Sequence, residues 1–541
     1  MAADPRQLNA MANRDAQRKR KAAGGGEQDA VFALMGDPAS YDPAPDAVKR
    51  IDTHAAVVFL AGALAYKIKR AVRLAYLDFS TLEKRRAFCE REVEINRANA
   101  PQVYLGVVPI VRRAGGALAI DGPGEAVEWA VKMRRFAQAN LFDALAGEGG
   151  LPIELMAPLA ATVADLHAKA RRVRGAHGAQ PLGRVAESIT ASLARAPPLL
   201  DTASVKQFTL AMGDALDARS ALLRRRERQG YVRRCHGDLH LRNIVLIEGQ
   251  PVLFDAIEFD EAVASVDIYY DLAFLLMDLW HRKLTQHANV LFNAYLRNRH
   301  ETEPLASLRG LALLPLFLAC RAGVRAMVTL DRLPFVTGAE RQEAVGELAE
   351  FFALAEMFLR PAPPRLIAVG GLSGTGKSTL AAALAPGIGA APGALVVRSD
   401  VERKRLAGVA ETARLEASHY SAAATGRVFR ALNAKAREAL AAGHPVVLDA
   451  VFAREDQRVR AQDVANKAKV PFTGLWLEAP DRQLLERVMA RRGDASDADA
   501  AIVQQQLGYE TGPISWVRVD ASGDPDTVRA RAAAALGLET A

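Results

Sequence analysis

The sequence predicts two fold classes in one chain, α+β before residue 361 and α/β after it. Before the run Pro361-Ala362-Pro363-Pro364, short apolar strands are followed by long helical stretches. After the run, apolar strands alternate with helices, a rhythm that predicts a parallel sheet with helices on both faces. Because a helix cannot continue through these prolines, we place a domain boundary there.

Composition supports a folded chain with several domains. The chain is 50% hydrophobic and 24% charged, which excludes wholesale disorder and a collagen-like repeat. Its 541 residues allow about three to four units, or two large ones, at roughly 150 residues each. We expect residues 1–30 to form a disordered tail, residues 31–360 one domain and residues 361–541 another.

Cysteine usage, hydropathy and charge exclude further classes. The 3 cysteines form no C-x-x-C pair, which argues against a disulfide framework or a zinc site and favours a reducing, cytoplasmic setting. The most apolar stretch, 265–280, contains three aspartates, so a plain membrane span is not expected. The net charge of +8 is compatible with binding phosphates or nucleic acid, but the charges are mixed along the chain.

In the N-terminal part, apolar runs and helical spacing predict each element in turn. Two strands surround a short turn at 61–62, and a charged stretch with helical spacing follows. The expected strands are 55–60, 63–68, 104–111, 117–120, 244–247 and 252–254; the expected helices are 81–99, 156–170 and 204–226, then a long helical stretch to about 359.

In the C-terminal part, four buried strands are expected at 366–369, 395–397, 446–448 and 473–477. The first strand leads into Gly371-Leu372-Ser373-Gly374-Thr375-Gly376-Lys377-Ser378, which fits the Walker A pattern G-x-x-x-x-G-K-[ST] of a P-loop. Glycines let backbone N–H groups approach phosphate oxygens, and the following helix, expected from 378 to 384, adds a favourable dipole. The sequence therefore predicts an ATP site with Mg²⁺.

Each residue of this loop has an expected task. The backbone of Gly371 to Gly376 and the helical residue Thr379 would surround the phosphates, Lys377 would contact the β- and γ-phosphates, and Ser378 would bind Mg²⁺. Two aspartates follow later strands, Asp400 and Asp449. Asp449 could complete the Mg²⁺ site as in a Walker B strand, or only cap the next turn.

Asp400 and Arg403 form D-x-x-R after the second strand, which resembles small P-loop kinases of the gluconate-kinase-like, polynucleotide-kinase-like and zeta-toxin-like groups. The resemblance covers about 365–541. It implies that Asp400 accepts the proton of a substrate hydroxyl and that Arg403 holds the acceptor; a helix cap with a solvated arginine is the alternative. Arg491 would belong to an ATP-binding lid, or to a solvated basic face together with Arg487 and Arg492.

A second motif lies at His236-Gly237-Asp238-Leu239-His240-Leu241-Arg242-Asn243, with Asp255 twelve residues later. The spacing of Asp and Asn is that of the protein-kinase catalytic loop. With H-G-D in place of H-R-D, and Ala256-Ile257 after the last Asp, the region resembles the aminoglycoside phosphotransferase and choline-kinase-like family. The resemblance implies a protein-kinase-like bilobal fold over roughly 50–345, Asp238 as catalytic base, and Asn243 and Asp255 as Mg²⁺ ligands.

That family also needs a phosphate-binding lysine paired with a helix glutamate. Lys67 and Lys69 share one face of a predicted strand because side chains alternate, and the choice between them stays open. Glu92, on the next helix, is the expected partner; an exposed basic strand edge is the alternative. The turn at 61–62 is poor in glycine, so no G-x-G-x-x-G loop covers this site.

The order of the motifs resembles bacterial two-domain proteins that join an aminoglycoside phosphotransferase-like domain to a P-loop kinase-like domain. We expect an ATP-dependent, Mg²⁺-dependent phosphotransferase with two sites that phosphorylate hydroxyl groups of small molecules. One alternative is a single kinase regulated by a nucleotide-sensing P-loop domain; another is a nucleic-acid 5′-hydroxyl kinase, which the scarcity of aromatic residues after Pro364 disfavours. No membrane partner is expected, and the acceptors and the oligomeric state stay open.

Overall fold

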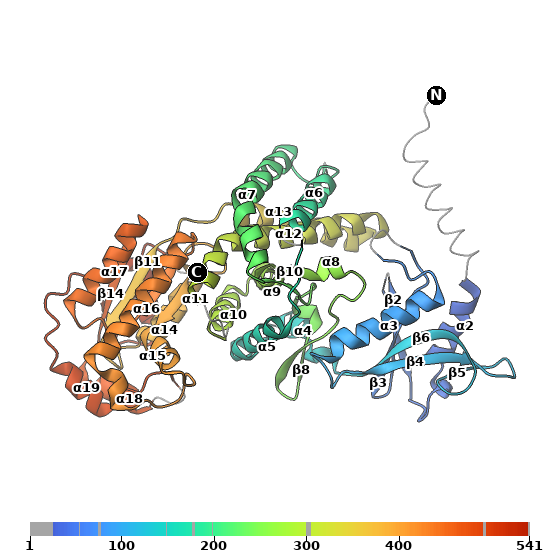
Figure 1. Cartoon of the computed structure of the whole chain (residues 1–541), viewed down its shortest axis with the longest axis horizontal. Coiled ribbons are helices and arrows are strands. Elements are labelled where there is room, and N and C mark those ends of the chain that lie inside the picture. Colours follow the sequence, from blue (N-terminus) through green and yellow to red (C-terminus); the bar gives the residue numbers. More distant parts are fainter. Residues whose placement is uncertain are drawn as a thin grey trace. The chain divides into compact units, whose positions relative to one another are not determined.

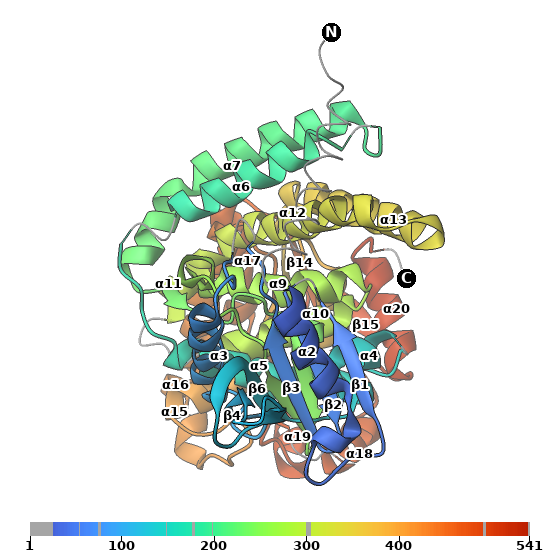
Figure 2. The ribbon, with the colours of Figure 1, turned by 90° about the vertical axis from the view of Figure 1, so that its right-hand side faces the viewer.

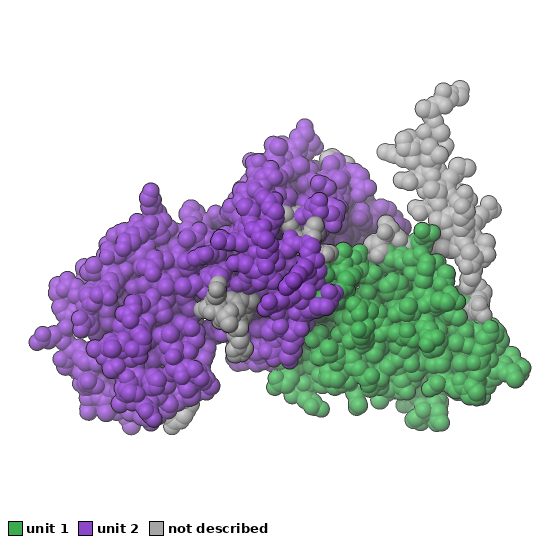
Figure 3. Space-filling view, in the orientation of Figure 1, with its two compact units in different colours: residues 1–151, 234–266 green, residues 152–233, 267–541 purple. Residues whose placement is uncertain are grey.

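The chain forms two compact units (Figure 3). Unit 1 comprises residues 1–151 and 234–266, and unit 2 comprises residues 152–233 and 267–541. The expected tail of residues 1–30 lies largely outside the described residues, although helix α2 (Gly25–Gly36) begins within it. The computed structural model describes residues 25–541 apart from 54, 74–76, 148, 176–178, 197, 299–303, 491–493 and 539–541.

Unit 1 contains a six-stranded sheet in the order β1-β2-β3-β6-β4-β5, with every neighbouring pair antiparallel. The two strands expected around residues 61–62 are present as β2 and β3, and Gly62 between them has a φ of 56°. The strands are β1 (Val48–Asp52), β2 (Ala56–Ala61), β3 (Leu64–Lys69), β4 (Tyr104–Arg112), β5 (Leu118–Ile120) and β6 (Glu125–Arg134).

Helices cover both faces of this sheet. Val31 and Phe32 of α2 pack with Tyr66 and Ile68 of β3 in one apolar core (Figure 2). On the other face lies α3 (Leu82–Arg97). The side chain of Thr81, the residue before it, caps its first turn by accepting a hydrogen bond from the Lys84 amide. Because alternate side chains of β3 face α2, the intervening lysines face α3.

The second segment of unit 1 carries the central motif. Its hairpin joins β8 (Ile244–Ile247) to β9 (Gln250–Leu253) through Glu248 and Gly249, which both have positive φ, as a tight two-residue turn requires. Val245 and Val252 of the hairpin pack with Cys89 of α3, so the motif and the helix share one core. The remaining short elements of unit 1 are α4 (Phe142–Gly147) and α8 (Glu261–Ala264), whereas β7 (Val232–Arg234) and β10 (Ser265–Asp267) include residues assigned to both units.

Unit 2 begins with helices, as the sequence predicts between residues 156 and 359. Asp201 caps the longest of them through a 2.7 Å hydrogen bond from the Ser204 amide. The helices are α5 (Met156–Lys169), α6 (Ala179–Leu193), α7 (Thr202–Arg228), α9 (Ile268–His281), α10 (Thr285–Asn298), α11 (Pro304–Arg309), α12 (Leu314–Arg332) and α13 (Gly338–Leu359).

The rest of unit 2 is a parallel sheet in the order β12-β13-β11-β14-β15, as the alternating rhythm after the proline run predicts (Figure 1). β11 lies between β13 and β14, where connections leave in opposite directions, so its carboxyl end is the expected ligand position. The strands are β11 (Leu366–Gly371), β12 (Leu395–Arg398), β13 (Val446–Asp449), β14 (Phe472–Glu478) and β15 (Val517–Asp520).

Helices pack on both faces of the parallel sheet. α14 and α20 bury Leu380 and Val528 against Ile367 and Leu475. α16 contacts β12 and β13, and α17 contacts β14. These helices are α14 (Lys377–Leu384), α15 (Ser399–Ala407), α16 (Ala422–Ala441), α17 (Glu455–Ala468), α18 (Asp481–Ala490), α19 (Ala500–Leu507) and α20 (Pro525–Ala535).

Within unit 2, two asparagines of α10 bind the edge strand of the parallel sheet. Asn293 Oδ1 accepts a hydrogen bond from the Val396 amide at 2.8 Å, and its Nδ2 donates to the Ala394 carbonyl at 3.1 Å. Asn289 Nδ2 donates to the carbonyls of Ala394 and Pro392 at 3.1 and 3.0 Å. The edge of β12 is therefore covered by a helix that precedes the proline run.

One helical stretch of the described chain, Leu305–Phe335, is long and apolar enough to cross a membrane by length and composition. Of its most apolar window, 67% is buried inside the protein, as in the core helix of a folded domain.

Candidate active sites

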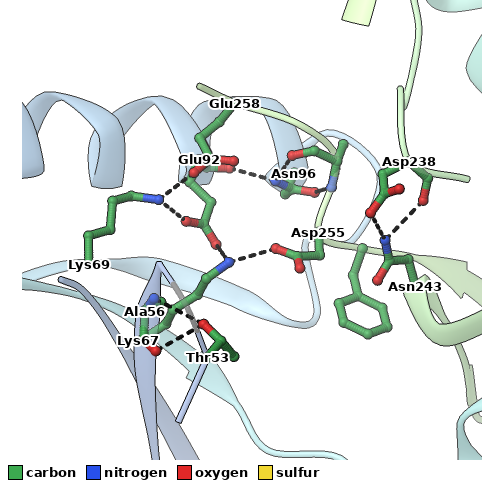
Figure 4. A network of polar contacts seen from close by, with 12 residues as sticks. Thr53, Ala56, Lys67, Lys69, Glu92, Asn96, Asp238, Asn243, Asp255 and Glu258 are labelled. Atoms are coloured by element: carbon green, nitrogen blue, oxygen red, sulfur yellow. Dashed lines mark hydrogen bonds and ion pairs between the residues drawn. The ribbon is translucent and has the colours of Figure 1, made fainter. Parts of the chain in front are cut away.

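In unit 1, β3 and α3 bring two lysines and a glutamate together (Figure 4). Lys67 Nζ lies 2.9 Å from Glu92 Oε1 and 2.6 Å from Asp255 Oδ1. Lys69 Nζ lies 2.7 Å from Glu92 Oε2 and forms a second ion pair with Glu258. Both lysines thus contact the expected glutamate, but only Lys67 contacts Asp255 among the described residues.

Burial and charge compete at this cluster. Burial alone would lower the pKa of Lys69, but Glu92 and Glu258 outweigh it and raise that pKa to about 12. Burial alone would raise the pKa of Glu92, but Lys67 and Lys69 lower it to about 2. The carboxylates of Asp255 and Glu92 likewise raise the pKa of Lys67 well above its ordinary value. Lys69 and Glu92 therefore stay ionised at neutral pH, whereas burial raises the pKa of Glu258 against the opposing charge of Lys69.

The catalytic-loop motif forms the other part of this site. Asn243 Nδ2 donates to the carbonyl oxygen of Asp238 at 2.9 Å and to its Oδ2 at 3.1 Å, which orients the carboxylate. The Phe254 amide donates to the Asn243 carbonyl at 3.1 Å, so the residue before Asp255 is tied to the motif. His236 is buried and its Nε2 lies 2.9 Å from the Phe254 carbonyl, in a structural position.

The donor set of this site fits a magnesium ion. Asp255 offers a carboxylate oxygen on a side chain that is 43% exposed, and Asn243 offers an amide oxygen next to the 40% exposed carboxylate of Asp238. Mg²⁺ prefers oxygen ligands and retains several waters, so one or two protein carboxylates suffice. Figure 4 shows Asp255 between Lys67 and the Asp238–Asn243 pair.

In unit 2, the P-loop follows β11 and leads into α14, as its motif requires. Gly371, Gly374 and Gly376 have φ values of 137°, 88° and 87°, which other residues rarely adopt. A Cβ atom on Gly374 would lie 2.5 Å from the Leu484 carbonyl oxygen, so the loop needs glycine for space as well. Such a loop exposes backbone N–H groups that fit the oxygens of a bound phosphate.

Asp449 ends β13 beside the P-loop. Its Oδ2 accepts a hydrogen bond from Ser378 Oγ at 2.6 Å and lies 3.2 Å from Arg398 Nε. Burial raises the pKa of Asp449, while the charges of Arg398 and Lys377 oppose this shift. The Ser378 hydroxyl and the Asp449 carboxylate form the oxygen pair that Mg²⁺ needs beside a P-loop.

A cavity of about 620 Å³ opens at the carboxyl ends of β11, β12 and β13. It is lined by the P-loop on one side and by Asp400, Arg403 and Tyr420 on another. Arg403 is 9% exposed; its Nη1 donates to the His419 carbonyl at 2.6 Å, and its guanidinium lies 4.7 Å from the centre of the Tyr420 ring. The cavity is large enough for a small-molecule ligand.

Some residues at this site were not expected from the sequence. Gln506 of α19 accepts a 2.7 Å hydrogen bond from the Ser373 amide and so fixes the first half of the P-loop. Arg398 joins Asp449 to Asp494, which lies 3.1 Å away. Both contacts join segments far apart in the chain, and no sequence motif marks them.

Of the three arginines expected in or near the lid, the structure describes Arg487. Arg491 and Arg492 lie outside the described residues. Arg487 donates to the carbonyls of Ala521 and Gly523 at 2.9 and 3.3 Å, so in this structure it supports the end of the sheet.

Known protein families match the parts of the chain before and after the proline run separately. The model of the phosphotransferase enzyme family matches residues 134–305, and that of an AAA domain matches residues 366–513. A choline/ethanolamine kinase family protein from Mesorhizobium loti is 17% identical, covering 61% of this chain and 99% of its own, with a TM-score of 0.35. A gluconokinase from Sinorhizobium meliloti is 24% identical, covering 32% of this chain and 93% of its own, with a TM-score of 0.24.

An uncharacterized protein of Mycobacterium tuberculosis is 31% identical over 485 residues, which cover 87% of this chain and 92% of the relative. This likeness runs through both domains and the segment that joins them. The chain therefore belongs to the same family as this mycobacterial protein, and it joins a kinase-like domain of the phosphotransferase enzyme family to a P-loop kinase-like domain.

Proposed function

We propose that this protein is a phosphotransferase with two Mg²⁺–ATP sites, each of which transfers the γ-phosphate to a hydroxyl group of a small molecule. Its phosphotransferase-family domains indicate a kinase, and kinases of this kind use ATP. The observation that carries the proposal is the position of Lys67, which contacts both the helix glutamate Glu92 and the expected metal ligand Asp255. We place the two catalytic domains at residues 31–360 and 361–541.

Lys67, rather than Lys69, is the phosphate-binding lysine in this proposal. Both lysines pair with two carboxylates, but the Lys67 side chain is 19% exposed and reaches Asp255, whereas that of Lys69 is 2% exposed and reaches Glu258 instead. A lysine that binds the α- and β-phosphates of ATP must have a side chain that is accessible from solvent. Glu92 holds Lys67 in place when no nucleotide is bound.

Asp238 is the proposed catalytic base of the kinase-like site. Its carboxylate accepts the proton of the acceptor hydroxyl while that oxygen attacks, and Asn243 orients it. Asn243 and Asp255 would hold Mg²⁺, which neutralises phosphate charge when bound. A base on one side and a lysine on the other place the acceptor and the nucleotide at opposite ends of the site.

At the P-loop site, Lys377 contacts the β- and γ-phosphates, and Ser378 and Asp449 would hold Mg²⁺. The backbone of Gly371 to Gly376, with Thr379 on α14, surrounds the phosphates. Asp400 is the proposed base, and Arg403 holds the acceptor, because both line one cavity with the P-loop. Arg491 would cover the nucleotide as part of the lid.

The experiment that tests this function is transfer of label from [γ-³²P]ATP into a fractionated pool of small metabolites. The full chain is compared with Asp238→Ala and Lys377→Ala. Asp165→Ala and Lys467→Ala, which change exposed residues outside both sites, are the matched controls. Two labelled products, each lost in one site variant only, are expected.

Other outcomes decide between the alternatives. A single product lost in both site variants would favour one kinase regulated by its P-loop domain. Label in added oligonucleotides would favour a 5′-hydroxyl kinase. No transfer by the unmodified chain to any pool would contradict the proposed function.

We further propose that the protein works in the reducing cytoplasm. Cys89, Cys235 and Cys320 are buried and form no disulfide in the described part of the chain. Buried cysteines of this kind pack as small apolar side chains.

A further inference from the structure

The segment that carries the metal ligand Asp255 is fixed to helix α3 at two successive turns. Asn96 Oδ1 accepts a hydrogen bond from the Ala256 amide at 2.7 Å, and Asn96 Nδ2 donates to the Glu92 carbonyl at 3.0 Å. Glu92, one turn earlier on the same helix face, reaches the segment through two lysines: Lys67, which also pairs with Asp255, and Lys69, which also pairs with Glu258 (Figure 4).

Lys69 is built into the protein interior. Its side chain is 2% exposed, and its Nζ lies 4.9 Å from the centre of the Phe79 ring. Its two carboxylate partners, Glu92 and Glu258, are 0% and 7% exposed. An ammonium group removed from water to this degree needs paired carboxylates, so Lys69 cannot leave them to bind a phosphate.

The contacts divide Glu92 between two tasks. Its Oε2 binds the buried Lys69, which leaves Oε1 for Lys67 at 2.9 Å. If the cation at Lys69 were lost, Glu258 would lose its ion-pair partner while Glu92 would keep Lys67, so the link between α3 and the segment 255–258 through Lys69 would be broken. Asp255 would then move away from Lys67.

We propose that Lys69 and Glu258 form a positioning clamp for the kinase-like site. The clamp couples α3 to the segment 255–258, so that Glu92 orients Lys67 and Asp255 stays in place to bind the metal of ATP. Asp255 has a φ of 59°, a conformation that non-glycine residues rarely adopt and that these contacts hold. Lys69 and Glu258 are positioning residues, and this inference rests on the proposed ATP site of the kinase-like domain.

The clamp makes a specific prediction about metal dependence. Neutralising Glu258 removes one of the two carboxylates that hold Lys69, so the segment with Asp255 loosens while Lys67 keeps its own oxygen of Glu92. We expect Glu258→Gln to weaken binding of ATP with Mg²⁺ by about tenfold, which corresponds to about 1.4 kcal/mol. Binding of ATP without Mg²⁺ should change by less than about twofold, because it does not use Asp255.

The test measures binding of a fluorescent ATP analogue, with and without Mg²⁺, to the full chain carrying Lys377→Ala, which weakens the P-loop site. Into this parent we introduce Glu258→Gln, Lys69→Arg, and the double change Lys69→Met with Glu258→Gln, which removes both charges and avoids an unpaired buried ion. Lys69→Arg keeps the cation and should retain the Mg²⁺ dependence of the parent. The double variant should lose it as Glu258→Gln does, since both changes break one clamp.

Glu128→Gln is the matched control. Glu128, on β6, is 0% exposed compared with 7% for the Glu258 side chain, and it pairs with Arg85 of α3 at 2.8 Å. This variant should lower thermal stability while the ratio of affinities with and without Mg²⁺ stays within about twofold of the parent.

Three results would overturn the clamp. One is a Glu258→Gln variant whose affinity ratio equals that of the parent, and another is an equal loss in Glu128→Gln, which would reveal general destabilisation. If the Lys377→Ala parent binds no nucleotide while the unmodified chain does, the ATP site of the kinase-like domain is wrong, and the clamp with it.

Discussion

Glu92 illustrates how a single buried residue acquires a fixed charge. A carboxylate with no exposed surface would ordinarily take up a proton, but Lys67 and Lys69 each donate to one of its oxygens. The lowered pKa keeps Glu92 ionised wherever the protein is folded. The position of Lys67 is therefore insensitive to pH in the neutral range, and any pH dependence of the kinase-like site comes from other groups.

A histidine in unit 2 gives the opposite case. His444 is buried before β13, and its ring centre lies 5.0 Å from that of Phe292 on α10. Burial lowers its pKa from 6.5 to about 4, so the folded protein holds it neutral. Below pH 6.5 the unfolded chain binds the proton first, and the free energy of unfolding falls as the pH drops to about 4, by up to about 3 kcal/mol.

We expect His444→Gln to remove this part of the pH dependence. Urea denaturation followed by circular dichroism would measure the free energy of unfolding of both proteins at pH 7.5 and at pH 4.5. The stability that depends on neutral His444 is fully present at pH 7.5 and partly lost at pH 4.5. The variant is less stable at pH 7.5 and the gap narrows at pH 4.5. A gap that stays constant between the two pH values would show that His444 does not titrate as described.

At the residue scale, the sequence identifies the groups that belong to compact motifs. Asp238, Asn243 and Lys377 could be named because each belongs to a motif whose own residues lie within a few positions of one another. Glu258 and Gln506 could not, because their partners lie more than a hundred residues away and only the fold joins them. The choice of Lys67 over Lys69 also needed the fold, since both share a strand face and only the contact with Asp255 separates them.

The P-loop requires glycine for two reasons, a positive φ and the lack of space for a Cβ atom. Gly374 and Gly376 share nearly the same φ, 88° and 87°, but a Cβ atom on Gly374 would clash with the Leu484 carbonyl at 2.5 Å, whereas one on Gly376 meets nothing within 4 Å. Gly376→Ala should cost only the strain of a left-handed alanine, about 1 kcal/mol. Gly374→Ala adds the clash and should cost about 2 kcal/mol more.

These two variants form a matched pair, because both place an alanine at the same backbone conformation in the same loop. Urea denaturation followed by circular dichroism measures the difference, and an ATP-analogue titration in a Lys67→Ala background, which weakens the other proposed nucleotide site, reports the loss of nucleotide binding at the P-loop. Equal destabilisation by both variants would mean that α18, which carries Leu484, moves aside without cost.

At the scale of elements, β1 and β15 were not expected from the sequence because they lack an apolar run, whereas the central strand β6 was missed although Val127, Ala130 and Val131 are buried. β15 leaves only Val519 of its residues buried, and β1 holds Lys49, Arg50 and Asp52 in five positions. Both are edge strands, which present one side to solvent and tolerate polar residues. Central strands such as β11 are buried along their whole length and were recognised from their hydrophobicity.

Across the whole chain, the proline run divides the sequence, but the compact units divide differently. Unit 2 contains both the helices before the run and the parallel sheet after it. The hydrogen bonds from Asn289 and Asn293 to the edge of β12 are one reason, because they join α10 to the sheet. Family motifs mark where domains begin, and they carry no information about such contacts.

We expect the change of both Asn289 and Asn293 to Ala to lower the free energy of unfolding of the parallel sheet by about 3 kcal/mol. The Ala394 carbonyl would lose its side-chain donors while it remains buried, and each such loss costs about 1–3 kcal/mol. Thermal unfolding is the measurement, with Asn466→Ala, an exposed asparagine on α17, as control. An unchanged melting temperature in the double variant would show that water replaces the asparagines.

The covered edge of β12 also bears on how this chain can be divided. A fragment that starts at the proline run would expose the edge of β12 as a row of unpaired backbone groups, which can template strand addition between copies. The asparagines of α10 thus act as a protective cover against self-association, supplied by a neighbouring part of the polypeptide. We therefore expect a fragment without α10 to self-associate more readily than the full chain.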